Sequence, residues 1–147
     1  MYNKIDENIT VEERGWVGHF ICGHRCIYHR NTLISASDGR KIVVSTIGKY
    51  KPVSTKVFLH LVNGFESIGG GQVEGNRYYE TAISYACFER GYYEYSPDEV
   101  IDNDSLLEYQ EKISRIDPSF YDSDGHADEY HDKIIQIVIN LLKENVL

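Results

Sequence analysis

The segment TLISASDGRKIVVSTI, residues 32–47, constrains the fold of this chain more than any other segment. Two runs rich in β-branched residues flank Asp38-Gly39, and an Asp-Gly step between such runs is a strong signal of a β-hairpin. The run Ile42-Val43-Val44 further favours an extended backbone. The sequence therefore predicts two antiparallel strands joined by a tight turn near residue 38.

More strands are expected on both sides of this hairpin. The segments WVGHFIC (16–22) and VFLHLV (57–62) have the composition of short strands. The segment RYYETAISYACF (77–88) alternates, and Glu89-Arg90-Gly91 before YYEY indicates that the chain returns as a second hairpin. One face of this strand would carry every second residue, namely Tyr79, Thr81, Ile83, Tyr85 and Cys87.

The last third of the chain has helical periodicity instead. Ser105 and Glu108 match a capping box, and the helix that follows should end at Asp117-Pro118, because proline disfavours the α conformation of the preceding residue. A second helix, from about Asp124, carries a wide apolar stripe that must be buried. Strands followed by helices predict an α+β fold, in which an antiparallel sheet from the N-terminal two-thirds packs against two C-terminal helices in an oligomer.

Length and composition indicate one domain over residues 1–147, with residues 1–13 as a loosely ordered segment. The chain is 41% hydrophobic, which is enough for a packed core. Three Cys are too few for a disulfide scaffold, and the first fifteen residues contain no apolar run. We therefore expect no signal peptide, no membrane partner, and a reducing cytoplasm as the location.

Charge is distributed unevenly along the chain, whose formal net charge is −8. Residues 14–77 carry nine Lys and Arg against three Asp and Glu, whereas residues 78–147 carry five against sixteen. A basic segment in an acidic protein favours a small anionic ligand in a local pocket. Long nucleic acid is not expected as a partner, because its rows of phosphates would meet the acidic remainder of the chain.

A zinc site is the first candidate for the His- and Cys-rich segment that begins near residue 18. Cys22 and Cys26 are separated by three residues, and the distant His126 and His131 by four, which are spacings that zinc sites use. About a hundred residues separate the two pairs, however, so we expect no metal and no cofactor. A thiol nucleophile at Cys26 is also disfavoured, since no oriented base accompanies it.

The same region contains the composition of a nucleotide pocket. Arginine binds phosphate oxygens in a bidentate manner, asparagine contacts bases or riboses, and tyrosine stacks on bases. The alternative is that these residues cap loops and pack at a sheet edge. The candidate ligand-binding residues are Arg25, Arg30, Asn31, Asn76, Arg77, Tyr78, Tyr79 and Tyr92.

Three segments share a further pattern: ERGWVGHFICGHRCIYHRNTLI, KIVVSTIG and NRYYETA. They resemble a group of small phage and prophage proteins that read G-W-x-G-H-F-I-C, a later Cys, R-N-T, I-V-V-S-T and R-Y-Y-E-T. This group is the family of Thoeris anti-defense sponges. The resemblance spans roughly residues 13–95 and adds little on the acidic helical tail.

The resemblance implies a function as well as a fold. Members bind a cyclic ADP-ribose isomer made by host immune TIR enzymes and hold it without cleaving it, in the host bacterial cytoplasm. It implies a dimer or a larger oligomer, up to a hexamer, with pockets near subunit interfaces, arginines on the pyrophosphate and an aromatic ring on the base. Arg30 maps onto a phosphate contact, whereas His29 stands where a second Arg is expected.

Two other functions remain open on the sequence. One is an enzyme, a phosphodiesterase or glycohydrolase, that destroys such a signal with the His- and Asp-rich start of the last helix. The other is a protein–protein inhibitor of a host defense component, which would use the acidic surface as a mimic of nucleic acid.

Overall fold

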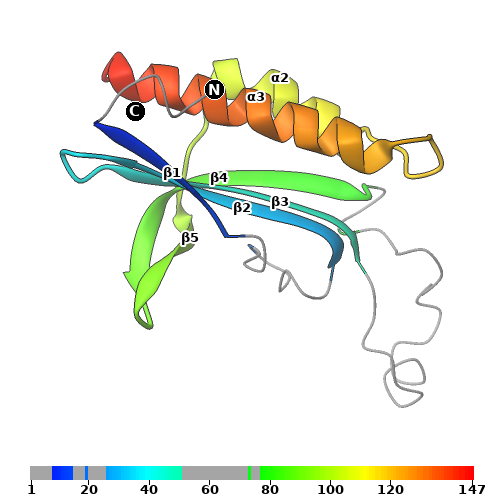
Figure 1. Cartoon of the computed structure of the whole chain (residues 1–147), viewed down its shortest axis with the longest axis horizontal. Helices are drawn as coiled ribbons and strands as arrows, with labels where there is room; N and C mark the ends of the chain where they lie inside the picture. Colours follow the sequence, from blue (N-terminus) through cyan, green and yellow to red (C-terminus); the bar gives the residue numbers. More distant parts are fainter. Residues whose placement is uncertain (1–7, 15–18, 20–25, 51–72, 74–76) are drawn as a thin grey trace.

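The computed structural model describes residues 8–14, 19, 26–50, 73 and 77–147, and these form one sheet covered by two helices (Figure 1). The sheet is antiparallel, and its strands follow the chain order β1-β2-β3-β4-β5. This is the α+β arrangement that the sequence predicts. The elements are β1 (Ile9–Glu13), β2 (Cys26–Ala36), β3 (Lys41–Tyr50), β4 (Tyr79–Glu89), β5 (Tyr92–Val100), α2 (Asp104–Ser114) and α3 (Ser123–Lys143).

Both predicted hairpins are confirmed. Ile34 pairs with Ile42 across the β2–β3 hairpin, and Gly39 supplies the positive φ, +103°, that its turn requires. The β4–β5 hairpin turns at Arg90 and Gly91, both with positive φ. The strands expected at 16–22 and 57–62 lie outside the described residues, apart from His19.

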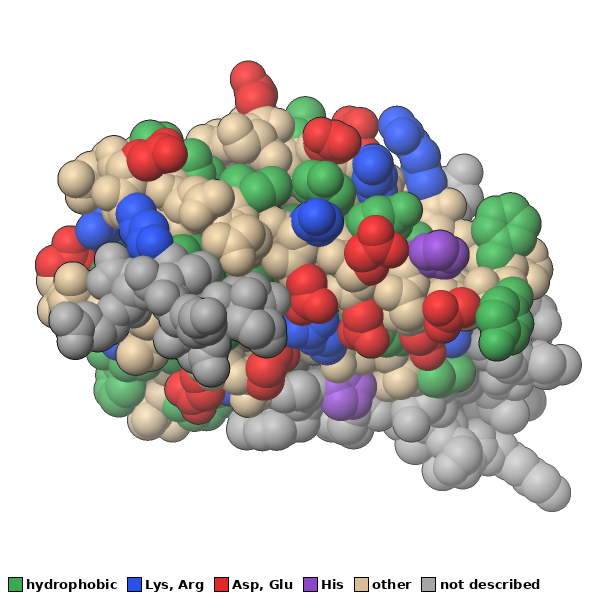
Figure 2. Space-filling view, turned by 45° about the horizontal axis from the view of Figure 1, so that its top comes forward, with side chains coloured by type: hydrophobic (Ala, Val, Ile, Leu, Met, Phe, Trp, Pro, Cys, Tyr) green, Lys and Arg blue, Asp and Glu red, His purple; other side chains and the backbone are tan. Residues whose placement is uncertain are grey.

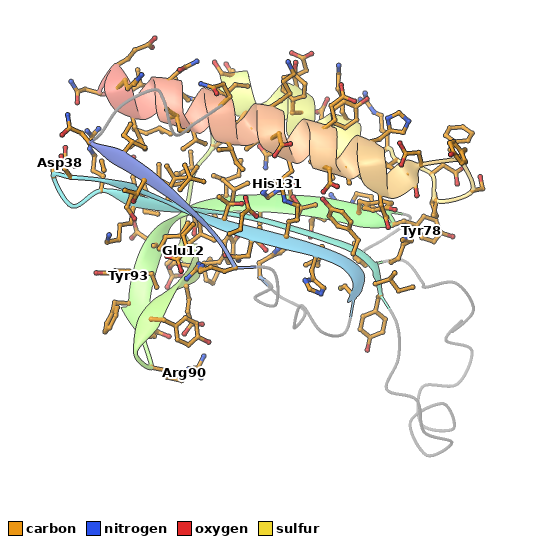
Figure 3. All side chains as sticks on the ribbon, viewed as in Figure 1. Glu12, Asp38, Tyr78, Arg90, Tyr93 and His131 are labelled. Atoms are coloured by element: carbon orange, nitrogen blue, oxygen red, sulfur yellow. The ribbon has the colours of Figure 1, made fainter. Side chains whose placement is uncertain are left out.

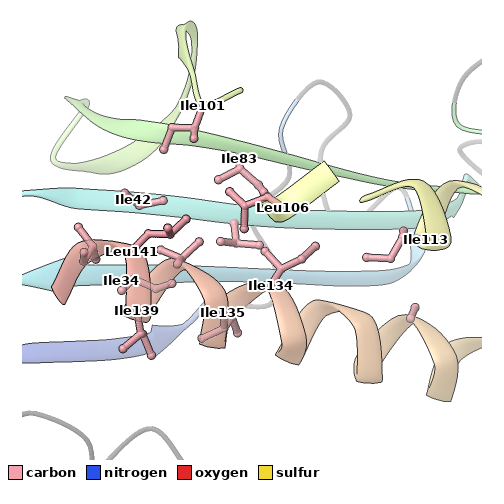
Figure 4. Packing of buried hydrophobic residues seen from close by; sticks show 14 of the residues in the cluster. Ile34, Ile42, Ile83, Ile101, Leu106, Ile113, Ile134, Ile135, Ile139 and Leu141 are labelled. Atoms are coloured by element: carbon pink, nitrogen blue, oxygen red, sulfur yellow. The ribbon is translucent and has the colours of Figure 1, made fainter. Parts of the chain in front are cut away.

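The hydrophobic core lies between the sheet and the helices (Figure 4). Alternate residues of the central strands, such as Ile34, Ile42 and Ile83, meet the apolar stripe of α3, in which Ile134 and Ile135 are fully buried. We call this side of the sheet the helix face and the other side the opposite face. Within the described residues, neither helix is apolar enough over a sufficient length to cross a bilayer.

Two local predictions are corrected. Residues 1–13 were expected to be loosely ordered, but Ile9–Glu13 form the edge strand β1, because Ile9 and Val11 pack against the core while the polar residues between and after them stay exposed. The N-cap of the first helix lies two residues before the expected Ser105. It is Asn103, whose side chain accepts from the backbone of Ser105 at 2.8 Å, since asparagine caps as well as serine does.

A bulge near Ser84 and Ala86 interrupts the pairing of β4 with β5. Bulges bend the strand that carries them, and the outer half of this hairpin turns away from the helices (Figure 1). The backbone of Ser96 donates to Ser84 Oγ at 2.9 Å, so β5 is fastened to a side chain of the opposite face. The hairpin thereby brings Tyr93 and Tyr95 to that face (Figure 3).

Candidate ligand-binding site

The three segments that carry the family pattern meet at the middle of the sheet. They contribute neighbouring strands. Arg30 pairs with Thr46, which pairs in turn with Thr81; Asn31 pairs with Ser45. Because successive residues of a strand point to opposite faces, the polar residues of each segment divide into two groups.

The first group, the helix-face cluster, surrounds a buried histidine of α3 (Figure 3). Arg30 points to this face, where its guanidinium lies 2.8 Å from Glu13, 3.0 Å from Asp132 and 3.5 Å from Asp128. Burial alone would lower the pKa of Arg30, but hydrogen bonds and charges from Glu13 and Asp132 outweigh it and raise the pKa. The cluster consists of Glu13, Arg30, Thr32, Thr46, Thr81, Asp128, His131 and Asp132.

His131 lies between Thr32 and Thr46, and the other hydrogen bond of Thr32 shows which ring nitrogen donates. Thr32 donates its single hydroxyl hydrogen to Glu13 at 2.9 Å, so it accepts from His131 Nε2 at 2.8 Å. Thr46 Oγ1 lies 2.7 Å from Nδ1 and donates to it when the ring is neutral. Burial, with Arg30 as a second cause, lowers the pKa of His131 well below its ordinary value. The ring is therefore a neutral structural link between α3 and the sheet.

Two tyrosines fasten the start of α3 to the same face. Tyr28 donates to Asp128 at 2.6 Å, and Tyr79 donates to Asp124 at 2.5 Å and contacts Ser123 Oγ at 2.9 Å. Burial first, and the acidic acceptors second, raise the pKa of both hydroxyls. Tyr79 is fully buried, so its ring is part of the core rather than a stacking surface for a ligand.

The second group, the opposite-face cluster, consists of Arg14, His19, Asn31, Ser45, Arg77 and Glu80. Arg14 donates from Nε and Nη2 to Asn31 Oδ1 at 3.1 and 2.8 Å, and from Nη1 to the carbonyl of Tyr93 at 2.6 Å. These acceptors are neutral, in contrast to the carboxylates around Arg30. Burial lowers the pKa of Arg14, against the raising effects of Glu12, Tyr92 and Glu94.

A chain of polar contacts occupies the rest of this cluster. His19 Nδ1 lies 2.8 Å from Ser45 Oγ, its Nε2 lies 3.2 Å from Glu80, and Glu80 pairs with Arg77 at 3.0 Å. The order Ser–His–carboxylate is that of a hydrolase triad. Ser45, however, is fully buried within a strand paired on both sides, so its neighbouring N–H groups serve the sheet and are not oxyanion donors.

Tyrosines of β5 border the opposite-face cluster. The rings of Tyr95 and His19 are 5.6 Å apart, and Lys41 lies 5.0 Å from the ring centroid of Tyr93. Tyr93 lies on the side of the sheet away from the helices (Figure 3). Tyr92, at the start of β5, is 37% exposed, and Phe88 across the hairpin is 61% exposed. Cationic groups and aromatic faces thus occur together on this side.

The C-terminal segment that contains both helices carries most of the net negative charge. Residues 101–147 contain eleven Asp and Glu against four Lys and Arg. Seen from the helix side, the surface carries many acidic side chains and fewer basic ones (Figure 2). An anion approaching this side would be repelled, and Arg30 there is already neutralised by three carboxylates. The opposite face is therefore the better surface for an anionic ligand.

The predicted ligand-binding residues are divided between the two faces. Asn31 and Arg77 belong to the opposite-face cluster, whereas Arg30 and Tyr79 lie on the helix face. One compact ligand on one face of this chain cannot contact both groups. Tyr78 packs, partly buried, beside the core, and Tyr92 is exposed on β5. Arg25 and Asn76 lie outside the described residues.

The metal candidates do not come together in the described part of the chain, where no group of three or more His, Cys, Asp and Glu is placed to hold an ion. Both ring nitrogens of His131 are occupied by threonines. His126 is exposed and stacks on Tyr130 at 6.3 Å. Cys26 is buried beside Ile47 and Val73, and Cys22 lies outside the described residues.

Sequence reasoning missed Arg14 as a site residue and considered His19 only beside the metal candidates. Both stand in the segment E-R-G-W-V-G-H, the start of the first of the three segments quoted for the resemblance. Asn31, the partner of Arg14, is 17 residues away in the sequence, and Glu80, a partner of His19, is 61 residues away. Only the folded sheet brings each residue to its partner.

Comparisons of this chain with protein families, with curated proteins and with solved structures found no match.

Proposed function

We propose that this protein binds a small nucleotide signal of the cyclic ADP-ribose type on the opposite face of its sheet and sequesters it without cleaving it. In this proposal it is a phage protein that acts in the host bacterial cytoplasm and blocks anti-phage defense. The observation that carries the proposal is the convergence of the three family-pattern segments on the opposite face, where Asn31 of β2 pairs with Ser45 of β3 and His19 joins Ser45 to Glu80 of β4.

The charges on the opposite face support an anionic ligand. Arg14 is half-buried and donates to neutral oxygens, whereas Arg77 is 37% exposed and pairs with Glu80 at 3.0 Å. A guanidinium that is partly desolvated without a close counter-ion attracts phosphate strongly. Arg30 was the first residue expected to contact phosphate, but its three carboxylates favour a structural role instead.

The aromatic side chains support a nucleotide rather than a simple anion. Tyr92, Tyr93 and Tyr95 lie on the strand that borders Arg14 and His19. Base–aromatic stacking contributes roughly 1–3 kcal/mol per base. A sequestering protein acts by stoichiometry, and a dissociation constant of ~10 nM corresponds to about −11 kcal/mol. Two charged hydrogen bonds to phosphate, at about 1.5–3 kcal/mol each, and two stacked rings reach this value at the upper end of their ranges.

We also propose that the functional form is a dimer or a larger oligomer. Phe88 and Tyr92 expose aromatic surface on the β4–β5 hairpin, next to the proposed binding face. A second copy packed there would enclose a ligand on the sheet and exclude water from its phosphates. Mass photometry of the purified protein, with and without nucleotide, measures the subunit number.

Ligand retention tests the proposal directly. The purified protein is incubated with cyclic ADP-ribose isomers and with cyclic dinucleotides, separated from unbound material, denatured by heat, and the released compounds are identified by mass spectrometry. Intact cyclic ADP-ribose in the supernatant is the expected result. A cleaved product would identify an enzyme instead, and no retained nucleotide would leave a protein–protein inhibitor as the better explanation.

Two arginine variants locate the binding face. Arg77 and Arg115 each pair with a glutamate, at 3.0 and 3.4 Å. Arg77 belongs to the opposite-face cluster, whereas Arg115 follows α2 on the helix side. We expect R77A to reduce retention about tenfold or more, because a charged hydrogen bond to phosphate is lost. We expect R115A to retain nucleotide as the unmodified protein does. Equal retention by both would contradict the assignment of the opposite face.

A further inference from the structure

The amide of Asn31 is oriented by its neighbour. Its Oδ1 accepts two hydrogen bonds from Arg14, at 3.1 and 2.8 Å, so the amide nitrogen must be the group that points away from the guanidinium. Asn31 is fully buried, and its Nδ2 has no hydrogen-bond partner in the part of the chain that the structure describes. A buried, unpaired donor is destabilising and requires an explanation.

We propose that Arg14 and Asn31 form an oxyanion subsite, in which the oriented amide and the guanidinium together donate to phosphate oxygens of a ligand. Arg14 uses three of its N–H groups on Asn31 and Tyr93, which leaves two for the ligand. The subsite rests on the function proposed above, since it names the group that receives the pyrophosphate of the nucleotide. Arg14 both positions the amide and supplies positive charge.

The carboxylates around the subsite limit its affinity. Glu94 and Glu12 both act on the Arg14 guanidinium, and Glu94 Oε2 is buried without a hydrogen-bond partner among the described residues. Glu94 pairs with Arg90 at 3.5 Å through its other carboxylate oxygen. Their charge opposes an incoming phosphate, so removal of one charge should tighten binding.

The change N31D tests the subsite with little loss of shape. A carboxylate still accepts from Arg14 and becomes its counter-ion, but it has no donor for the ligand and repels an anion. We expect an unchanged or higher melting temperature together with at least tenfold weaker binding. N140D on the exposed face of α3 is the matched control, because it adds the same charge on the helix side and should bind within twofold of the unmodified protein.

The change E94Q gives the opposite result and stays informative if N31D fails to fold. It removes a competing charge beside Arg14, and we expect binding several-fold tighter. Two probes, inorganic pyrophosphate and cyclic ADP-ribose, are titrated by calorimetry into the full chain and each variant. Weakening by N31D and tightening by E94Q support the subsite; a change of less than twofold in both variants overturns it.

The two probes separate the subsite from the proposed function. Pyrophosphate binding that depends on Asn31, without binding of cyclic ADP-ribose, would retain the subsite and overturn the proposed ligand. Binding of cyclic ADP-ribose that is unaffected by N31D and E94Q would retain the function and overturn the subsite. Binding of neither probe would overturn both.

Discussion

Replacement of Arg30 by alanine distinguishes a structural guanidinium from a ligand-binding one. The Arg30 side chain is 20% exposed and lies 2.8 Å from Glu13, 3.0 Å from Asp132 and 3.5 Å from Asp128. These contacts join β1 and β2 to α3. R30A therefore removes the cation from a cluster of three carboxylates and leaves their mutual repulsion uncompensated.

The size of the stability loss in R30A follows from how exposed the three carboxylates around Arg30 are. The three carboxylates are 46, 51 and 54% exposed, so each pair contributes less than a buried pair and more than a fully solvated one. We expect a loss of about 2 kcal/mol in the free energy of unfolding, which corresponds to a fall of about 6 °C in the melting temperature of a chain of this size. The loss should shrink at 1 M salt, because salt screens partly exposed pairs.

Differential scanning calorimetry and the retention assay decide the role together. R30A should melt earlier and still retain nucleotide, and the control R115A should change neither property, since Arg115 is 75% exposed and 3.4 Å from Glu111. The reasoning would be refuted if R30A kept its melting temperature within 1–2 °C, roughly the effect of a surface substitution, and lost nucleotide retention.

Two further predictions concern stability. Burial and the charge of Arg30 lower the pKa of His131, so below about pH 6.5 the unfolded chain binds a proton that the folded chain does not. The contribution of the neutral ring to the free energy of unfolding is fully present above this pH and should fall by about 1 kcal/mol between pH 6.5 and 5.5. Denaturant titrations across this range should show that increment in the unmodified protein, and an equal slope in H131Q would contradict the assignment. A Cβ at Gly48 would lie 2.7 Å from Cε2 of the buried Tyr79 ring, so G48A should cost about 2 kcal/mol in chemical denaturation. G39A, where the Cβ meets open space, should show only the smaller cost of a positive φ, about 1 kcal/mol, and an equal loss in both variants would exclude the steric explanation.

The elements that the sequence predicted correctly are those with local signals. Gly39, Arg90 and Gly91 stand at turns and adopt positive φ, and the apolar stripe of the last helix requires burial wherever it packs. β1 was missed because its two apolar residues, Ile9 and Val11, are separated and followed by polar ones, and a five-residue strand has no stability without its partner. Its pairing with β2 depends on the folded sheet.

The site was harder to predict because strand alternation separates residues that are adjacent in the sequence. Arg30 and Asn31 were expected to contact one ligand, yet a strand necessarily directs them to opposite faces. The sequence contained this information once 26–36 was recognised as a strand. What it did not contain is the partner of each residue: Arg30 meets carboxylates of α3 that are 98 and 102 residues away, and Asn31 meets Arg14.

The acidic helices do not prevent an anion from binding on the other side of the sheet. The exposed carboxylates of α2 and α3 are separated from the opposite face by a layer of helices roughly 10 Å across and by the sheet itself. The Debye length at physiological ionic strength is about 8 Å, so salt largely screens these carboxylates from an anion on that face. Glu94 is not screened in this way, because it acts on Arg14 across partly buried protein. The net charge of −8 therefore says less about ligand binding than the identity of the oxygen atoms nearest each guanidinium. Carboxylates surround Arg30, whereas Arg14 donates to an amide and a carbonyl, and this difference is what leaves Arg14 able to attract a phosphate.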